Sequence, residues 1–106
     1  MKWYDMLWVG PRAARRKGKI ISSVKQGKSV PEVWLITLAE NPSEALDLVP
    51  SHMLAKPWYP SENLYILGIA SGKQEAFELV EKMVDYIYRE TGTLYIRDYF
   101  LQRFHS

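Results

Sequence analysis

Three stretches of the chain are apolar almost throughout, and they set the predicted architecture. They are Trp3–Val9, Val33–Ala39 and Leu64–Ala70. A strand with one face in water alternates apolar and polar residues, whereas a strand covered on both faces does not. The pattern therefore predicts three buried strands, and Thr93–Ile96 is predicted as a short fourth strand at an edge.

A long amphipathic helix is predicted after the third strand, over residues 72–90. Ser71 and Gln74 have the spacing of a capping box, and Gly92 suits the left-handed position that ends many helices. The helical spacing sorts the side chains between them onto two sides. The predicted core side holds Ala76, Phe77, Val80, Val84 and Ile87, and the predicted solvent side holds Glu75, Glu78, Lys82, Asp85 and Arg89.

Three further helices are predicted. The first covers residues 11–26 and begins at Pro11, a residue that suits the first turn of a helix. The second follows Asn41-Pro42-Ser43-Glu44, because a capping residue, a proline and an acid in this order are typical of a helix start; Ala45, Leu46, Leu48 and Val49 would form its buried stripe. The third is a short aromatic helix over residues 98–104.

The resulting order alternates strand and helix four times within 106 residues, a length typical of one domain over residues 1–106. Such alternation favours a parallel sheet with right-handed crossovers. We therefore expect an α/β fold, a small three-layer Rossmann-like or flavodoxin-like sandwich. It would have about four mainly parallel strands and helices on both faces.

Composition removes several kinds of chemistry. The chain has no cysteine, which excludes disulfides and cysteine zinc sites, and His52 and His105 are too far apart in sequence to form a metal motif. We predict no metal, no cofactor and no catalytic residue. The chain has no apolar signal core and no run near the roughly 18 to 20 apolar residues of a membrane span. A cytoplasmic protein without membrane contact is expected.

Charge is distributed unevenly along the chain. Residues 6–31 hold seven basic and no acidic residues, while the other 80 residues hold seven basic and twelve acidic ones. On the predicted first helix, Arg12, Arg15, Arg16 and Lys19 have the spacing of one basic face. This face is either solvated, paired with the acidic helix, or a contact for an anionic partner. Nucleic acid is an unlikely partner on the overall charge of +2, although this charge does not exclude it.

The segments WYDMLWVGPRAARRKGK, VWLITLAEN, ENLYILGIASGKQEAFELV and YRETG together resemble a group of short, uncharacterised α/β proteins from Firmicutes. The resemblance covers nearly the whole chain. It implies a fold and a bacterial cytoplasmic setting. It transfers no activity and no site residues.

A binding site for a small anion is predicted at the carboxyl edge of the sheet. In a parallel sheet three helix starts would meet there, and their free N–H groups favour phosphate or carboxylate. The predicted ligand residues are Arg12, Asn41, Ser71, Gly72 and Lys73. The segment Gly68–Lys73 does not match a P-loop, because its glycines are too close together and Gln74 replaces the hydroxyl residue.

Three functions follow in order of preference. The first is a binding or interaction protein, acting as a homodimer through the C-terminal aromatic segment or an edge strand, because the chain has many aromatic residues for its size. The second is an enzyme or ligand-binding protein that holds a phosphorylated or anionic small molecule, with Asp5 or Glu40 as a base. The third is a nucleic-acid-associated protein that uses the basic helix at residues 11–27.

Overall fold

The computed structural model describes residues 1–41 and 43–105. The strands in these ranges are β1 (Lys2–Val9), β2 (Val33–Leu38), β3 (Leu46–Pro50) and β4 (Tyr65–Ser71). The α-helices are α1 (Pro11–Ala14), α2 (Lys17–Lys25), α3 (Lys73–Thr91) and α4 (Ile96–His105), and short 3₁₀ turns cover Ser51–Ala55 and Ser61–Asn63.

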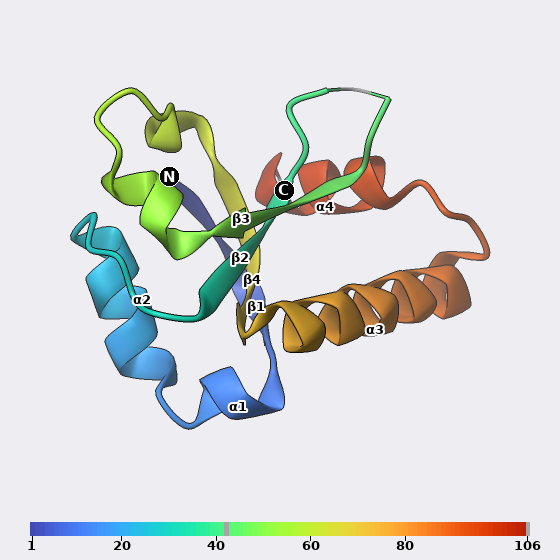
Figure 1. Ribbon diagram of the computed structural model, residues 1–106. Coiled ribbons are helices and arrows are strands. Elements are labelled where there is room, and N and C mark those ends of the chain that lie inside the picture. Colours follow the sequence, from blue (N-terminus) through green and yellow to red (C-terminus); the bar gives the residue numbers. More distant parts are fainter. Residues whose placement is uncertain (42, 106) are drawn as a thin grey trace.

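The four strands form one mixed sheet in the order β1-β4-β2-β3. Strand β4 is parallel to β1 and antiparallel to β2, and β2 is antiparallel to β3. The prediction of an α/β fold with helices on both faces is confirmed (Figure 1). The prediction of a mainly parallel sheet is wrong, so the sheet gives no support to a Rossmann-like or flavodoxin-like arrangement.

The hairpin of β2 and β3 is the reason for this difference. Residues 45–49 were predicted as a helix, but β3 occupies most of this range and pairs with β2, with Leu48 opposite Ile36. Along β3, Leu46 and Leu48 pack on one face of the sheet and Val49 packs on the other, which is the two-residue period of a strand. Pro42, in the predicted helix start, lies outside the described residues.

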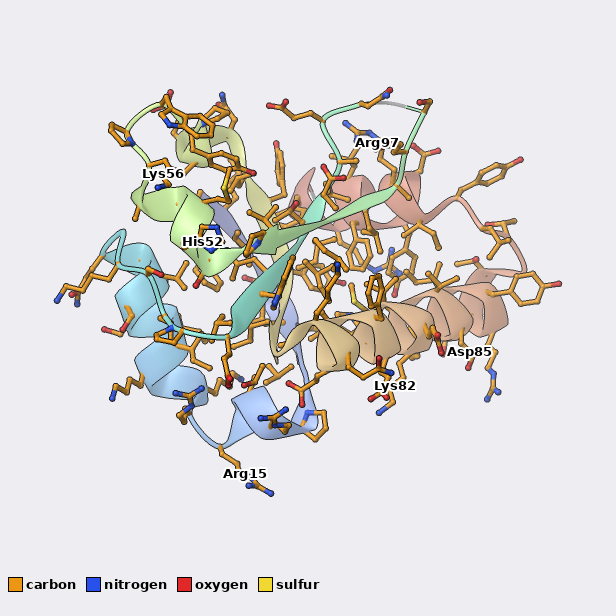
Figure 2. The ribbon with its side chains drawn as sticks, in the orientation of Figure 1. Arg15, His52, Lys56, Lys82, Asp85 and Arg97 are labelled. Carbon is orange, nitrogen blue, oxygen red and sulfur yellow. The ribbon has the colours of Figure 1, made fainter. Side chains whose placement is uncertain are left out.

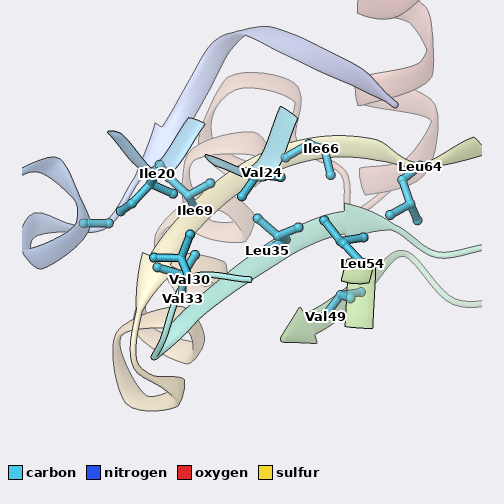
Figure 3. Packing of buried hydrophobic residues seen from close by; sticks show 11 residues of the cluster. Ile20, Val24, Val30, Val33, Leu35, Val49, Leu54, Leu64, Ile66 and Ile69 are labelled. Carbon is cyan, nitrogen blue, oxygen red and sulfur yellow. The ribbon is translucent and has the colours of Figure 1, made fainter. Parts of the chain in front are cut away.

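Each face of the sheet carries its own core. Helix α2 and the turn at Ser51–Ala55 cover one face, where Ile20 and Val24 meet Leu35 and Ile69 (Figure 3). Helices α3 and α4 cover the other face. Strand β4 is apolar toward both layers and buried along nearly its whole length, as predicted for the central stretch.

Gly68 in the middle of β4 allows a close backbone approach. A Cβ atom on Gly68 would lie 3.1 Å from the carbonyl oxygen of Trp8. The register between β1 and β4 shifts between Trp3 and Trp8, so part of β1 leaves the ladder. Residues Asp5 and Met6 of this part are exposed.

One helix prediction and one strand prediction also change. The predicted helix over residues 11–26 is divided into α1 and α2 by a turn at Arg15 and Arg16. The predicted strand at 93–96 is absent from the described sheet, because α4 begins at Ile96. The side chain of Arg97 in α4 donates a hydrogen bond to the carbonyl oxygen of Ala39, which fastens α4 to the end of β2.

Candidate functional site

The starts of α1 and α3 meet beside the carboxyl ends of β1 and β4, and the carboxylate of Glu75 lies between them. Its Oε1 atom accepts a hydrogen bond from the backbone N–H of Arg12 at 2.6 Å. Its Oε2 atom accepts from the N–H of Ala13 at 3.2 Å and from the N–H of Ser71 at 2.6 Å. Glu75 is only 5% exposed, so these three N–H groups provide its polar environment.

The position of Glu75 is a correction to the sequence analysis, which placed this residue on the solvent side of α3. Glu75 is the third residue of α3, three positions after the capping residue Gly72, and an acid at this position can fold back toward the helix start. The predicted pairing of Ser71 and Gln74 is not formed, because the Gln74 side chain donates to Glu78 at 3.1 Å. The sequence signal that could have placed Glu75 correctly is its position as the third residue of a helix, where an acid often accepts hydrogen bonds at the helix start.

Gly10 provides the space for this carboxylate. A Cβ atom built on Gly10 would lie 2.4 Å from Glu75 Oε2 and 2.5 Å from its carboxyl carbon. The backbone of Gly10 has φ −65° and ψ 153°, which any residue can adopt. The requirement for glycine is therefore steric, and it concerns the close approach of Glu75.

The structure brings four of the five predicted anion ligands to this edge. Arg12, Ser71, Gly72 and Lys73 lie together, and Nη1 of Arg12 is 3.6 Å from the position of a Cβ on Gly72. However, Ser71 is buried and its N–H already serves Glu75, as do the N–H groups that begin α1. Anion binding at this edge of the sheet stays a prediction. The carboxylate of Glu75 occupies the place in which the prediction put the ligand.

Asn41 does not belong to this group. Since β2 runs antiparallel to β4, its carboxyl end lies at the opposite end of the sheet from Ser71, and Asn41 follows that end. The Oδ1 atom of Asn41 accepts hydrogen bonds from the N–H and the hydroxyl of Ser43, at 3.0 and 2.9 Å. Asn41 therefore holds a local turn, and the predicted convergence of three helix starts is wrong.

The same geometry separates the residues considered for catalysis. Glu40 lies next to Asn41, at the far end of the sheet from Lys73, so these two cannot act on one small substrate. Asp5 is exposed on the edge strand, which removes the burial that the base hypothesis required. His52 is exposed on the turn at Ser51–Ala55 (Figure 2).

The basic residues of the N-terminal segment surround α1 and α2. All of them are exposed. Within the described ranges none of them enters an ion pair, and the ion pair found there joins Asp85 to Arg89 on α3. The nitrogen of Lys25 lies 5.7 Å from the ring centre of Trp3. These residues are Arg12, Arg15, Arg16, Lys17, Lys19, Lys25 and Lys28. Arg15 points away from the fold (Figure 2).

A second apolar stripe runs along the outer side of α3. Phe77, Val80, Val84 and Tyr88 recur at helical spacing, and Leu94 follows after the end of the helix. Phe77, Tyr88 and Leu94 are 48%, 53% and 61% exposed, while Val80 and Val84 are half-buried. The part of the stripe from Val80 to Leu94 lines a shallow hollow of about 480 Å³, with Glu81 and Asp85 among its lining residues.

The C-terminal aromatic residues serve the fold rather than an outer surface. Phe100 is fully buried, and its ring centre is 5.1 Å from that of Tyr4. Phe104 packs on Tyr65, with ring centres 4.8 Å apart. The aromatic segment that was expected to cover a second subunit is thus largely used inside the chain, although Tyr95 is 72% exposed.

Comparison with protein families, curated proteins and solved structures finds no match for the chain. The resemblance to the Firmicutes group stays a prediction. None of the helices in the described ranges has the length and apolar character that a membrane crossing requires. Among the same residues, no group of three or more His, Asp or Glu side chains is placed to hold a metal ion.

Proposed function

We propose that this protein is a protein-binding module, and that its partner is an amphipathic segment with basic flanking residues held on the outer stripe of α3. The supporting observation is that apolar residues of α3 and Leu94, which follows the helix, line the same hollow. Large exposed apolar patches on small proteins are typical of interaction sites. An apolar stripe of this kind suits a helix whose own apolar residues recur at positions i, i+3, i+4 and i+7.

Charge supports the choice of partner. Glu81 and Asp85 line the hollow and are exposed, so a partner with Lys or Arg beside its apolar row is electrostatically complementary. A second copy of the chain suits the stripe less well. In an antiparallel two-fold pairing of α3 with its copy, the same flank of both helices meets, which brings Glu81 toward the partner's acidic flank. The earlier homodimer hypothesis therefore becomes an outcome to be tested.

The direct test uses a synthetic 16-residue helical peptide with leucines at helical spacing and lysines beside them. One control peptide has glutamates in place of the lysines, and another has the leucines in scrambled order. Amide chemical shifts of the isotope-labelled protein are followed during titration. We expect the lysine peptide alone to shift residues 77–95, with a dissociation constant in the micromolar range or above.

Two matched variants localise the contact. Val84→Gln places an amide in the stripe and is expected to weaken peptide binding at least tenfold. Lys82→Gln introduces the same side chain on the polar side of α3 and is expected to leave binding unchanged. Absence of shifts at millimolar peptide would contradict the proposal. A dimer in sedimentation analysis that Val84→Gln dissociates would replace the proposed partner with a second copy.

A further inference from the structure

We infer that the surface of α1, α2 and the following turn is a second, independent binding site, which takes the phosphate backbone of duplex nucleic acid. Seven cations lie on this surface between Arg12 and Lys28, with no acidic residue among them in the sequence. Within the described ranges none of the seven has an ion-pair partner. The inference does not depend on the stripe of α3, since it uses other residues and another partner.

The acidic residue built into this end of the molecule does not neutralise the basic side chains directly. The carboxylate of Glu75 is buried and receives backbone N–H groups, including that of Arg12. The Arg12 side chain itself is exposed. Glu75 thus holds the backbone that carries the first arginines, while their guanidinium groups stay available for phosphate oxygens.

The turn between α1 and α2 spreads the charge over two helix directions. Arg15 and Arg16 occupy the turn itself, and Arg16 is the capping residue before α2. The nine residues of α2 extend about 13 Å at 1.5 Å per residue. Duplex DNA carries about one charge per 1.7 Å of its axis, so several phosphates fall within reach of this surface.

The positions of the apolar and aromatic side chains favour a duplex over a lipid layer or a single strand. The large apolar side chains of α2 face the core, with Ile20 and Val24 fully buried, so they offer nothing to insert into a lipid layer. Single strands are held by stacking on exposed rings. The exposed rings in the described ranges are on other elements, and Trp3 lies half-buried beneath Lys25. These exposed rings are those of Trp58, Phe77, Tyr86, Tyr88 and Tyr95. A surface that offers positive charge but no exposed ring for base stacking suits the phosphate backbone of a duplex.

The test measures binding of the full chain to a labelled 24-base-pair duplex by fluorescence anisotropy between 50 and 200 mM salt. If Arg12, Arg15, Arg16 and Lys19 each contact a phosphate, the logarithmic salt slope is about −3.6 and affinity falls about 150-fold over this range. The triple variant Arg15→Ala, Arg16→Ala, Lys19→Ala is expected to reduce the slope to about −1.

The matched control neutralises three exposed lysines elsewhere, as Lys2→Ala, Lys56→Ala and Lys82→Ala, with the same change in net charge. It is expected to keep a slope near −3.6. Circular dichroism melting shows whether each variant is folded. An equal loss in both triple variants would overturn the inference, as would absence of duplex binding at 50 mM salt. Binding only to a single strand of the same length, or only to vesicles of anionic lipid, would overturn it as well.

Discussion

The carboxylate of Glu75 accepts a hydrogen bond of 2.6 Å from the backbone N–H of Arg12, a residue 63 positions away in the chain. Through Ala13 and Ser71 the same side chain also joins the start of α1 to the end of β4. Helix starts favour an anion, because their N–H groups have no partner within the helix. In this protein the anion is the carboxylate of Glu75, and its hydrogen bonds hold the start of α1 in place.

Replacement of Glu75 tests this role. In Glu75→Gln the amide group keeps one acceptor oxygen, and its NH₂ group would face backbone donors that it cannot satisfy. We expect a loss of about 2 kcal/mol or more in the free energy of unfolding, since hydrogen bonds to charged groups contribute about 1.5 to 3 kcal/mol each. Urea unfolding measures the loss. Glu78→Gln, at an exposed position one turn further on, should cost less than about 0.5 kcal/mol.

Gly10 and Gly18 are expected to respond in opposite directions to alanine. Gly10→Ala forces a methyl group into the Glu75 carboxylate and should destabilise the fold by about 1 to 3 kcal/mol. Gly18 lies in α2, and a Cβ there meets nothing within 4 Å. Gly18→Ala should stabilise by about 0.5 to 1 kcal/mol through helix propensity. Thermal unfolding of the two variants gives both signs, and a loss at Gly18 would contradict this account.

The elements that the sequence predicts well are those with several agreeing local signals. The strand ending in Ser71 is apolar on both faces, and the helix after it is capped by Gly92, which has the expected positive φ of 73°. The segment at Asn41 gave a misleading signal. Its capping pattern serves a turn, and the strand after it is set by pairing with β2, a contact that local patterns do not contain.

Only part of the candidate site could be predicted, because the prediction also rested on local patterns. A parallel sheet was assumed, so Asn41 was grouped with Arg12 and Ser71; one reversed strand separates them. Glu75 was assigned to solvent because the helical period describes the middle of a helix better than its first turn. The partner of its carboxylate, the N–H of Arg12, comes from the start of a helix that follows another strand, and no spacing rule relates the two residues.

Stability at high pH should depend on Tyr4. Its pKa is raised above the usual value of about 10, first by burial and then by the neighbouring Tyr99, while Arg103 acts in the opposite direction. Above about pH 10 the unfolded chain therefore releases this proton more readily than the folded chain. The stability contribution is complete below pH 10 and is lost as pH rises through the raised pKa.

Urea midpoints of the native chain and of Tyr4→Phe, measured from pH 8 to 11, check this prediction. The native midpoint should fall above pH 10, and Tyr4→Phe should fall less, because it keeps the ring contact with Phe100 and removes the titrating hydroxyl. Tyr95→Phe removes a largely exposed hydroxyl and serves as the control. Equal curves for Tyr4→Phe and the native chain would refute the argument.

Ser51 joins the turn at the end of β3 to the loop that follows the basic surface, and we expect its removal to weaken that connection. Its hydroxyl donates to the carbonyl of Val30 at 2.7 Å and accepts from the N–H of Val30 at 3.1 Å, in a buried position. In Ser51→Ala the carbonyl keeps the N–H of Val33 as a donor, but the buried N–H of Val30 loses its partner. The expected cost is about 1 to 3 kcal/mol. Hydrogen exchange should accelerate first at Val30, and the exposed change Ser22→Ala should leave both stability and exchange at Val30 nearly unchanged.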